Sequence, residues 1–343
     1  MIRLLCIGLG GMGHHDWNAA LDTGRFTPVG GFDIDEKARA AFAEKTDAPV
    51  FTDFSEALTG VEADAALIST PDKFHAPYTH QALDAGLDVI CEKPMAETLR
   101  DGYLMHFAAV DRGRMLMIHQ QLRWNPMHNH ARRLIEEGAI GDVRRIDFDM
   151  SVFSGVCLSG YRSELPHLIL QDLAIHHLDL IRYLSGQECE SLYVRDWPSV
   201  EAGQSITAAT DACAILNMTG PVTACYTSGI RRLMDHVGYA CAARICGSEG
   251  ELSLRDDQIT LQTRAAHAAE EEPQVITPEP PAVGTWESFA RAIETREPTL
   301  TSSGNNLKSL EILFAAIQSA ESGEIVSIDS LRQSSEIAPF PAP

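Results

Sequence analysis

The 343-residue chain is short of basic residues, of closely paired cysteines and of long apolar runs. It has 27 lysines and arginines against 48 aspartates and glutamates, and the resulting net charge of −21 repels nucleic-acid phosphates and anionic lipid surfaces. Its eight cysteines form no C-x-x-C pair, so free thiols in a reducing compartment are expected. No apolar run reaches the ~20 residues that a membrane-spanning helix needs. We therefore expect a cytoplasmic protein that binds neither nucleic acid nor membrane.

The pattern of apolar residues divides the chain near residue 122. Before this point, short β-rich apolar runs alternate with amphipathic helical stretches, which is the pattern of βαβ units in a parallel sheet. After it, runs that alternate with period two indicate a largely antiparallel sheet interrupted by one helix. A polar segment over residues 265–281 is expected to be a loop. We predict two α/β domains, residues 1–122 with a doubly wound parallel sheet and residues 123–343 with an open, largely antiparallel sheet.

A glycine-rich turn follows the first predicted strand and opens a helix. In Gly8-Leu-Gly10-Gly-Met-Gly13, the first glycine makes the turn, the second lets the backbone approach a pyrophosphate, and the third allows close packing of helix on strand. Asp33 ends the second predicted strand, where an acid binds the adenosine ribose hydroxyls. No lysine or arginine follows Asp33 immediately to neutralise a 2′-phosphate, so NAD is favoured over NADP. The alternative is a tight glycine turn that binds no nucleotide.

Polar residues also follow two later strands of the first domain. Ser69-Thr70-Pro71 and His75 come after one strand, and Glu92-Lys93-Pro94 comes after the next, at the edge where ligands bind in open α/β sheets. A lysine there can hydrogen-bond a substrate hydroxyl and stabilise the alkoxide that develops as hydride leaves. An isolated lysine at a strand end would more often be a surface residue.

Together these motifs resemble the glucose-fructose oxidoreductase / inositol dehydrogenase (Gfo/Idh/MocA) family, nearly end to end. The resemblance implies an N-terminal Rossmann domain and a C-terminal α/β domain whose open sheet forms homodimers or homotetramers. It also implies hydride transfer between a secondary alcohol of a sugar, sugar derivative or cyclitol and the nicotinamide cofactor. By the same resemblance Lys93 is the catalytic lysine, Glu92 lies near the nicotinamide ribose, and the Lys93–Pro94 bond can be cis. Besides the motifs above, it rests on Arg123-Trp-Asn-Pro126, on Asp172-x-Ala-x-His176-x-x-Asp179, and on Gly247-Ser-Glu-Gly250.

The stretch from Leu170 to Asp179 allows three interpretations. If residues 172–184 are helical, Asp172, His176, Asp179 and Tyr183 share one face, whereas His177 points about 100° away. Asp172 and His176 could be metal ligands, but no third strong ligand pattern lies nearby. All the polar groups could instead be satisfied inside a core, which suits His177 best. The favoured interpretation is catalytic, and we predict no metal.

In the catalytic interpretation the roles follow the family resemblance. His176 removes the hydroxyl proton as the hydride passes to the cofactor, a task that suits an imidazole titrating near neutral pH. Asp172 orients the substrate and, with Lys93, sets the charge balance. The predicted cofactor-binding residues are Gly8, Gly10, Met12, Gly13, Asp33, Ser69, Thr70, Pro71, His75 and Glu92. The predicted substrate-binding residues are Lys93, Arg123, Trp124, Tyr161, Arg162, Asp172 and His176.

The chain also departs from the family pattern. Many relatives have glycines just before the aspartate, whereas this chain has Pro166-His-Leu-Ile-Leu-Gln171, which should reshape the pocket wall and puts a simple inositol-like substrate in doubt. Trp17, in the helix after the glycine turn, is expected to pack rather than to contact the cofactor. Two further functions stay open: an NAD-dependent glycosidase that oxidises its sugar transiently, and a non-catalytic NAD or sugar sensor, which the presence of Lys93, Asp172 and His176 makes less favoured.

Overall fold

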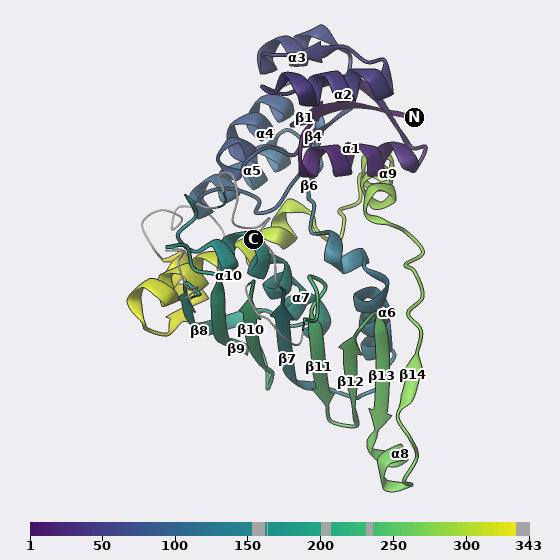
Figure 1. Ribbon diagram of the computed structural model, residues 1–343, viewed down its shortest axis with the longest axis vertical. Coiled ribbons are helices and arrows are strands. Elements are labelled where there is room, and N and C mark those ends of the chain that lie inside the picture. The colour runs from purple at the N-terminus through teal and green to yellow at the C-terminus, as the bar shows by residue number, and fades with distance from the viewer. Residues whose placement is uncertain (153–161, 163, 200–206, 231–235, 334–343) are drawn as a thin grey trace. The chain divides into compact units, whose positions relative to one another are not determined.

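The computed structural model describes residues 1–152, 162, 164–199, 207–230 and 236–333 (Figure 1). The chain forms two compact units. The first comprises residues 1–120 and 283–307, and the second comprises residues 121–282 and 308–342.

A six-stranded parallel sheet forms the centre of the first unit. Its strands β1, β4 and β5 are almost wholly buried, as expected for a sheet covered by helices on both faces. The strand order reverses between β1 and β4, so a ligand crevice is expected at the carboxyl ends of these strands. The predicted doubly wound parallel sheet is therefore confirmed. In spatial order the strands are β3 (Val50–Phe51), β2 (Phe26–Phe32), β1 (Ile2–Ile7), β4 (Ala65–Ile68), β5 (Asp88–Cys91) and β6 (Leu116–Ile118).

Side-chain caps define where three helices of the first unit begin. Asp35, Asp53 and Thr98 each accept a hydrogen bond from a backbone N–H in the first turn of the helix that follows. Helix α1 begins without such a cap, because its N-cap is Gly11 and no side chain caps its first turn. The helices are α1 (Met12–Asp22), α2 (Glu36–Thr46), α3 (Phe54–Gly60), α4 (His75–Asp84) and α5 (Leu99–Asp111).

Residues 283–307 pack with the first unit, although the division predicted near residue 122 places them in the second. In helix α9 (Thr285–Thr295), Trp286 and Phe289 are buried and their rings contact Phe26 of β2. The hydroxyl of Thr301 donates to the carbonyl of Ile118 at the end of β6. Contacts between residues almost 200 positions apart hold this segment, which explains why local sequence patterns did not reveal it.

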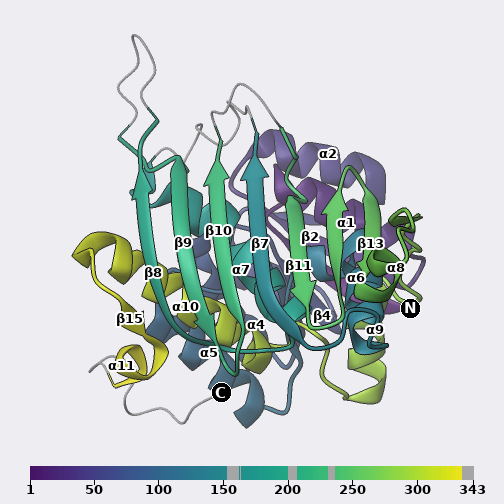
Figure 2. The same cartoon turned by 90° about the horizontal axis from the view of Figure 1, so that it is seen from below.

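A nine-stranded sheet forms the second unit, and every neighbouring pair is antiparallel except β7 with β10 (Figure 2). The predicted open, largely antiparallel sheet is thus confirmed. In spatial order its strands are β14 (Gln274–Ile276), β13 (Gln258–Thr263), β12 (Gly250–Arg255), β11 (Ala242–Gly247), β7 (Val143–Ser151), β10 (Thr223–Gly229), β9 (Asp211–Met218), β8 (Cys189–Trp197) and β15 (Val326–Ser327).

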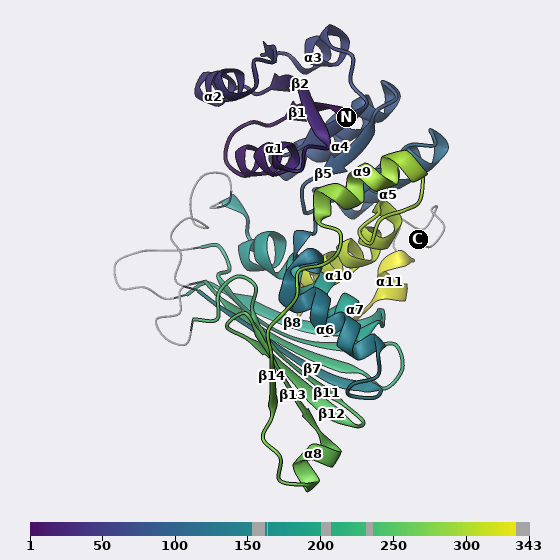
Figure 3. The same ribbon diagram turned by 90° about the vertical axis from the view of Figure 1, so that its right-hand side faces the viewer.

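Helices cover one face of this sheet, and Figure 3 shows α6 (Pro126–Glu136) and α7 (Ile175–Ser185) on the same side of the strands. The other face is open, so buried and exposed residues alternate along β9. A π-helix, Ile169–Ala174, leads directly into α7. The remaining helices are α8 (Arg264–Ala268), α10 (Ser303–Ser322), whose residues from Lys308 onward belong to this unit, and α11 (Ile328–Arg332).

Three further expectations bear on the fold. The predicted loop over residues 265–281 contains most of α8 and the edge strand β14, which pairs with β13, so that expectation was wrong in part. The seven cysteines within the described residues are free thiols. In the part of the chain that the structure describes, no helix combines the length and apolar character required to cross a bilayer.

Candidate functional site

The glycine turn between β1 and α1 is shaped by close backbone contacts. Gly8 has φ +86°, and a Cβ placed on it would lie 2.3 Å from the carbonyl oxygen of Ser69. A Cβ on Gly13 would lie 2.1 Å from the carbonyl oxygen of Gly8. Gly10 is more open, since the nearest atom to a Cβ added there would belong to Ala38, at 3.6 Å. Gly8 and Gly13 are therefore required for packing, whereas Gly10 leaves its backbone open to a ligand.

Asp33 closes one side of this turn. Its Oδ2 accepts hydrogen bonds from the backbone N–H groups of Leu9, at 2.7 Å, and Gly10, at 3.3 Å. A pocket of about 230 Å³ lies between Asp33 and the loop that follows β4, with Phe74 and Tyr78 in its wall. Aromatic walls beside a carboxylate suit an adenosine, whose base is planar and whose ribose donates hydroxyl hydrogen bonds.

The residues present fit a dinucleotide. The first turn of α1 is free of acidic side chains and of a side-chain cap, so its N–H groups and its positive dipole end can bind a pyrophosphate. Met12, the first residue of α1, is 40% exposed. Ser69, Thr70 and Pro71 line the same pocket as Asp33. The structure thus brings most of the predicted cofactor residues to one edge of the sheet.

His75 holds two of these loops together. One ring nitrogen lies 2.8 Å from the carbonyl oxygen of Pro94, and the other lies 2.8 Å from the carbonyl oxygen of Thr70. The imidazole is 1% exposed. This position favours a role in fixing the loops after β4 and β5 over direct contact with a cofactor. The Lys93–Pro94 peptide bond is cis.

A buried charged cluster, which the sequence patterns did not indicate, lies at the carboxyl ends of β4, β5 and β6. His119 Nδ1 lies 2.5 Å from Oε1 of Glu92 and 3.5 Å from Oδ1 of Asp16, and the hydroxyl of Ser69 donates to Oδ2 of Asp16 over 2.9 Å. Glu92 also accepts a hydrogen bond from the backbone N–H of Lys93. We call Asp16, Glu92 and His119 the buried triad.

Burial and mutual charge shift the pKa values in the buried triad. Burial, together with the nearby Glu92, raises the pKa of Asp16 to about 6. Burial alone would lower the pKa of His119, but the two carboxylates outweigh it and raise that pKa to about 9. Burial opposes ionisation of Glu92 too, yet the contact with His119 lowers its pKa overall. His119 is therefore an imidazolium at neutral pH.

Among the described residues, the buried triad is also the one group of acids, histidines or cysteines compact enough to hold a metal ion. Its ligand atoms lie within 4.8 Å of one another. His119 Nδ1 and Glu92 Oε1 lie within hydrogen-bond distance of each other, so a metal ion would have to replace the proton shared between them. The predicted alternative pair, Asp172 and His176, is not part of this group.

In the second unit, Asp172 lies on the π-helix, and not on the α-helix expected over residues 172–184. Its Oδ2 accepts a hydrogen bond from Arg162 Nε at 3.0 Å. His176 is 1% exposed on α7, and the ring of Tyr239 packs edge-on against it with centroids 5.1 Å apart. Short π-helical segments within helices occur frequently at functional sites.

Asp179 has a different set of partners from Asp172. It forms two hydrogen bonds with Arg123, each of 2.7 Å, and accepts a third from the hydroxyl of Ser309. Arg123 and Asp179 are both almost fully buried. Arg123 thus lies in a buried ion pair, which gives it a structural role at this position. Asp179 supports the fold of α7 by the same contact.

The other predicted residues of this stretch have varied environments. Trp124 is 8% exposed. His177 is fully buried, with its ring nitrogens 2.9 Å from the Tyr226 hydroxyl and 3.0 Å from the Tyr239 carbonyl, as the core interpretation of this residue predicts. Trp17 is buried against Phe42, in agreement with the expected packing role. Tyr161 lies outside the described residues.

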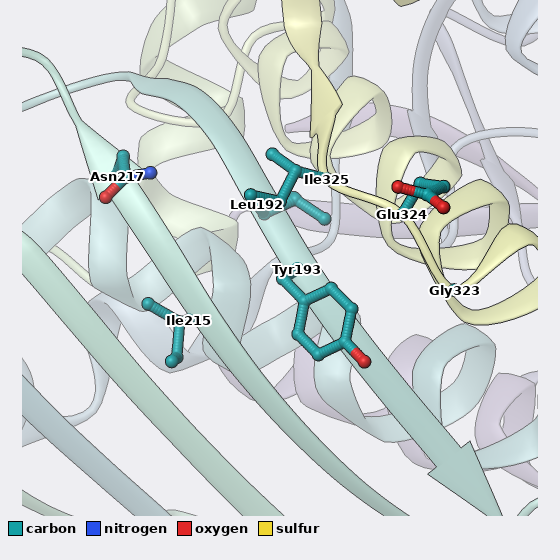
Figure 4. A pocket seen from close by; sticks show the side chains of 7 residues that line it. All are labelled: Leu192, Tyr193, Ile215, Asn217, Gly323, Glu324 and Ile325. Carbon is teal, nitrogen blue, oxygen red and sulfur yellow. The ribbon is translucent and has the colours of Figure 1, made fainter.

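A second pocket lies on the sheet of the second unit (Figure 4). Leu192 and Tyr193 of β8, Ile215 and Asn217 of β9, and residues 323–325 line it. The lining is mainly apolar, and Glu324 is the one acid among the residues that form it. Its chemistry therefore suits packing against another surface and not catalysis.

Comparisons with known structures support the same architecture. An oxidoreductase from Agrobacterium radiobacter in complex with NAD+, L-tartaric acid and magnesium has a TM-score of 0.87 and 20% identity, covering 96% of this chain and 99% of that one. Levoglucosan dehydrogenase in complex with NADH and levoglucosan has a TM-score of 0.84 and 18% identity, covering 95% and 99%. At these identities the likeness establishes the fold.

Sequence comparisons establish the family. D-apiose dehydrogenase of Paraburkholderia graminis is 28% identical over 322 residues, which cover 86% of this chain and 81% of that protein. Inositol 2-dehydrogenase of Rubrobacter xylanophilus is 26% identical over 196 residues, 55% of this chain and 52% of that protein. Residues 2–120 match the oxidoreductase family with an NAD-binding Rossmann fold, and residues 128–253 match the GFO/IDH/MocA C-terminal domain. The chain therefore belongs to the Gfo/Idh/MocA family of oxidoreductases.

Proposed function

We propose that this protein is an NAD-dependent oxidoreductase that acts on a secondary alcohol of a sugar, sugar derivative or cyclitol. The observation that carries the proposal is the edge of the parallel sheet, where the glycine turn follows β1, Asp33 follows β2 and Lys93 comes just after β5. When bound there, NAD+ would supply the hydride acceptor, C4 of its nicotinamide. The relatives named for D-apiose and inositol act on polyhydroxylated compounds, which supports this substrate class.

NAD is the proposed cofactor because of the charge around the adenosine pocket. Asp33 and Asp35 both line it. A 2′-phosphate would place additional negative charge against these carboxylates, whereas the two ribose hydroxyls of NAD can donate hydrogen bonds to Asp33. Arg39 is nearby, but its Nη1 donates to the backbone carbonyl of Asp33. This charge distribution disfavours NADP.

We assign the chemical steps to Lys93, Asp172 and His176. Lys93 hydrogen-bonds the reacting hydroxyl and stabilises the negative charge that develops on its oxygen. His176 accepts the hydroxyl proton. Asp172 orients the substrate, and its ion pair with Arg162 holds the carboxylate in place. Glu92, which accepts from the backbone N–H of Lys93, fixes the loop that carries the lysine.

Substrate contacts are proposed for Arg162, Trp124 and Tyr161. Arg123 is proposed to act indirectly, because its ion pair with Asp179 anchors the segment that carries Trp124. Arg162 is 26% exposed in its side chain, so it is open to solvent on one side while it holds Asp172. Leu168, Ile169 and Leu170 are buried, so the segment that replaces the family's glycines packs into the core. Three bulky side chains in place of glycines fix the segment that leads to Asp172, and on that ground we propose a substrate other than a simple inositol.

A substrate screen tests the proposed function. The protein would be incubated with sugars, sugar acids and inositols and either NAD+ or NADP+, and formation of reduced cofactor followed by absorbance. Net reduction of NAD+ by at least one free sugar or cyclitol is the expected result. Release of an aglycone from a glycoside without net reduced cofactor would show the glycosidase reaction instead. Cofactor binding with neither reaction would support a sensor.

The role assignments need variants. Lys93→Met is expected to abolish turnover while NAD+ affinity stays nearly unchanged, and Lys37→Met, on the exposed side of α2, is the matched control. His176→Ala is expected to slow oxidation greatly and to change its pH profile. If the His176→Ala profile were the same as that of the parent, His176 would not be the base.

We also propose that the protein forms a homodimer or homotetramer through the open face of its antiparallel sheet. Ile215 is 51% exposed on this face, and the pocket of Figure 4 adds apolar surface beside it. Ile215→Asp is expected to shift the sedimentation coefficient to that of a monomer. A cytoplasmic location is proposed as well, because the described thiols are free.

A further inference from the structure

The buried triad is assembled from three separate elements of the first unit. Asp16 lies on α1, Glu92 follows β5, and His119 follows β6. Each of the three residues is less than 5% exposed. His119 contacts both acids, since its Nδ1 lies 2.5 Å from Glu92 and 3.5 Å from Asp16. Such a group exists only when α1 and the ends of β5 and β6 are correctly packed.

The three members of the triad do not balance one another's charge. Two buried carboxylates this close together require a counter-charge, and His119 supplies one positive charge for two negative ones. The hydroxyl of Ser69 donates to Asp16 but is neutral. The ring of Trp286 covers one side of His119. Two carboxylates and one imidazolium therefore give the triad a net charge of about −1 at neutral pH.

Other titratable groups face the triad. His15 is exposed beside Asp16, and the buried thiol of Cys6 interacts with Asp16 but stays neutral because burial raises its pKa. Lys93 and His75 act electrostatically on Glu92. Lys93 adds a positive charge outside the triad. It is unchanged in the variants described below, so they report on the triad's own charge.

Glu92 and His119 of the triad follow strands on the far side of the sheet from the adenosine pocket. That pocket is next to β2, and a dinucleotide would extend from there across the point where the strand order reverses, between β1 and β4. Its nicotinamide half would therefore lie toward the carboxyl end of β5, which Glu92 follows. The nicotinamide ring is positively charged in NAD+ and neutral in NADH, so a nearby buried charge acts on the two forms differently.

We propose that the buried triad is an electrostatic positioning device that makes the protein bind NAD+ more tightly, relative to NADH, than it would with a neutral triad. The inference rests on the proposed NAD-dependent function. Its consequence for that function is weaker retention of the reduced cofactor after oxidation of the alcohol. Asp16 and His119 act on the cofactor through their contacts with Glu92 and through the electrostatic field of their charges. They are therefore positioning residues.

Asp16→Asn tests the proposal because it removes one negative charge and keeps the shape of the side chain. In that variant His119 and Glu92 balance each other, and the ratio of the NADH dissociation constant to the NAD+ dissociation constant should fall about three- to thirtyfold. Asp22→Asn, an exposed charge on the same helix, is the matched control and should leave the ratio unchanged. Both constants would be measured by calorimetric titration of the purified chain.

A second variant separates charge from shape. Asp16→Asn combined with His119→Gln leaves Glu92 as the one charged member, so the charge of −1 returns and the ratio should move back toward the parent value. A purely structural role predicts that the double variant is worse than either single one. In the parent protein the ratio should also rise as pH increases toward about 9, where His119 loses its proton.

The possible outcomes distinguish failure of the triad proposal from failure of the proposed function. Binding of both cofactors with the same ratio in Asp16→Asn, in Asp22→Asn and in the parent at every pH would overturn the triad proposal and leave the proposed function intact. Failure of the parent to bind either cofactor would overturn both. One equivalent of a divalent metal retained by the purified parent and lost in Asp16→Asn, measured by mass spectrometry, would also overturn it, since the metal would replace the proton.

Discussion

Arg123 and Asp179 form a buried, two-pronged ion pair in which the guanidinium Nε and Nη2 each lie 2.7 Å from a carboxylate oxygen. Ser309 donates to the same carboxylate, and Arg182 lies 3.6 Å from it. The pair joins the short helical segment Gln121–Trp124 to α7, the helix that carries His176. It therefore fixes the element on which the proposed base depends.

Replacing Asp179 with asparagine should destabilise the second unit strongly. The change leaves Arg123 and the nearby Arg182 without their shared counter-charge in a buried site, which typically costs about 3–5 kcal/mol. Urea unfolding would measure the loss. Glu136→Gln is the control, because Glu136 pairs with Arg132 on the surface of α6, where such pairs contribute less than about 1 kcal/mol. Equal effects of the two changes would contradict the buried role of Asp179.

Gly8→Ala should abolish cofactor binding and destabilise the first unit. The new Cβ would lie 2.3 Å from a backbone oxygen that cannot move without displacing β4, in addition to the cost of a positive φ. Gly24→Ala separates these effects, because Gly24 also has positive φ but a Cβ added there would have no atom within 4 Å. We expect the control to lose about 1–2 kcal/mol and to keep its NAD+ affinity. Similar NAD+ affinities in both variants would argue against the assigned turn.

Asp33→Ser should relax the preference for NAD over NADP. Removing the carboxylate removes its repulsion of a 2′-phosphate, so the affinity for NADP+ relative to NAD+ should rise at least about tenfold. Asp35 is the comparison, since it caps α2 through the backbone N–H of Lys37 and does not contact the glycine turn. Asp35→Asn is expected to change this ratio less. A larger effect from Asp35 would move the specificity role to that residue.

His119 should make the stability of the first unit depend on pH. Its pKa is about 9 in the folded protein against an ordinary value of 6.5, so the folded form holds the proton more tightly. The stabilisation is complete below about pH 6.5 and is lost as pH rises through about 9. In Asp16→Asn, where one of the carboxylates that raise this pKa is gone, the loss should be smaller.

Pulse proteolysis in urea at about pH 6.5 and about pH 8.5, with quantification of fragments from residues 1–120, measures this dependence. The window lies above the titration of Asp16, whose pKa is about 6. A stability that is the same at both pH values in the parent, or that rises with pH, would contradict a protonated His119.

Sequence patterns within a few neighbouring residues predicted the features that depend on those residues alone, namely the strands, the helices and the glycine turn. The period of the apolar residues gave both sheets, and the strand–glycine–helix context gave the turn at Gly8, because backbone geometry at such a turn permits no other residue. The role of Asp33 was predicted from its position after the glycine turn, at the end of the second strand. The position of Lys93 after a strand pointed to a role in the site, and the family resemblance assigned catalytic roles to Lys93 and His176.

Contacts between distant segments could not be predicted in this way. Asp16 and His119 are 103 positions apart in the sequence, and only the folded sheet brings them together. A buried aspartate in an amphipathic helix and a histidine directly after a strand were the available signals. The π-helix at Asp172 adds one residue to a turn that a periodic pattern treats as an α-helix, so the α-helical spacing that was assumed from Asp172 to Asp179 does not apply there.

Transfer of deuterium from substrate to cofactor tests hydride transfer, the central claim, most directly. A sugar or cyclitol that reduces NAD+ in the screen would be labelled with deuterium at the carbon bearing the reacting hydroxyl, and the cofactor would be analysed by mass spectrometry after turnover. One deuterium on the nicotinamide of the NADH formed is the expected result. Reduced cofactor without deuterium, or product released with the label retained and no net NADH, would contradict direct hydride transfer from the alcohol.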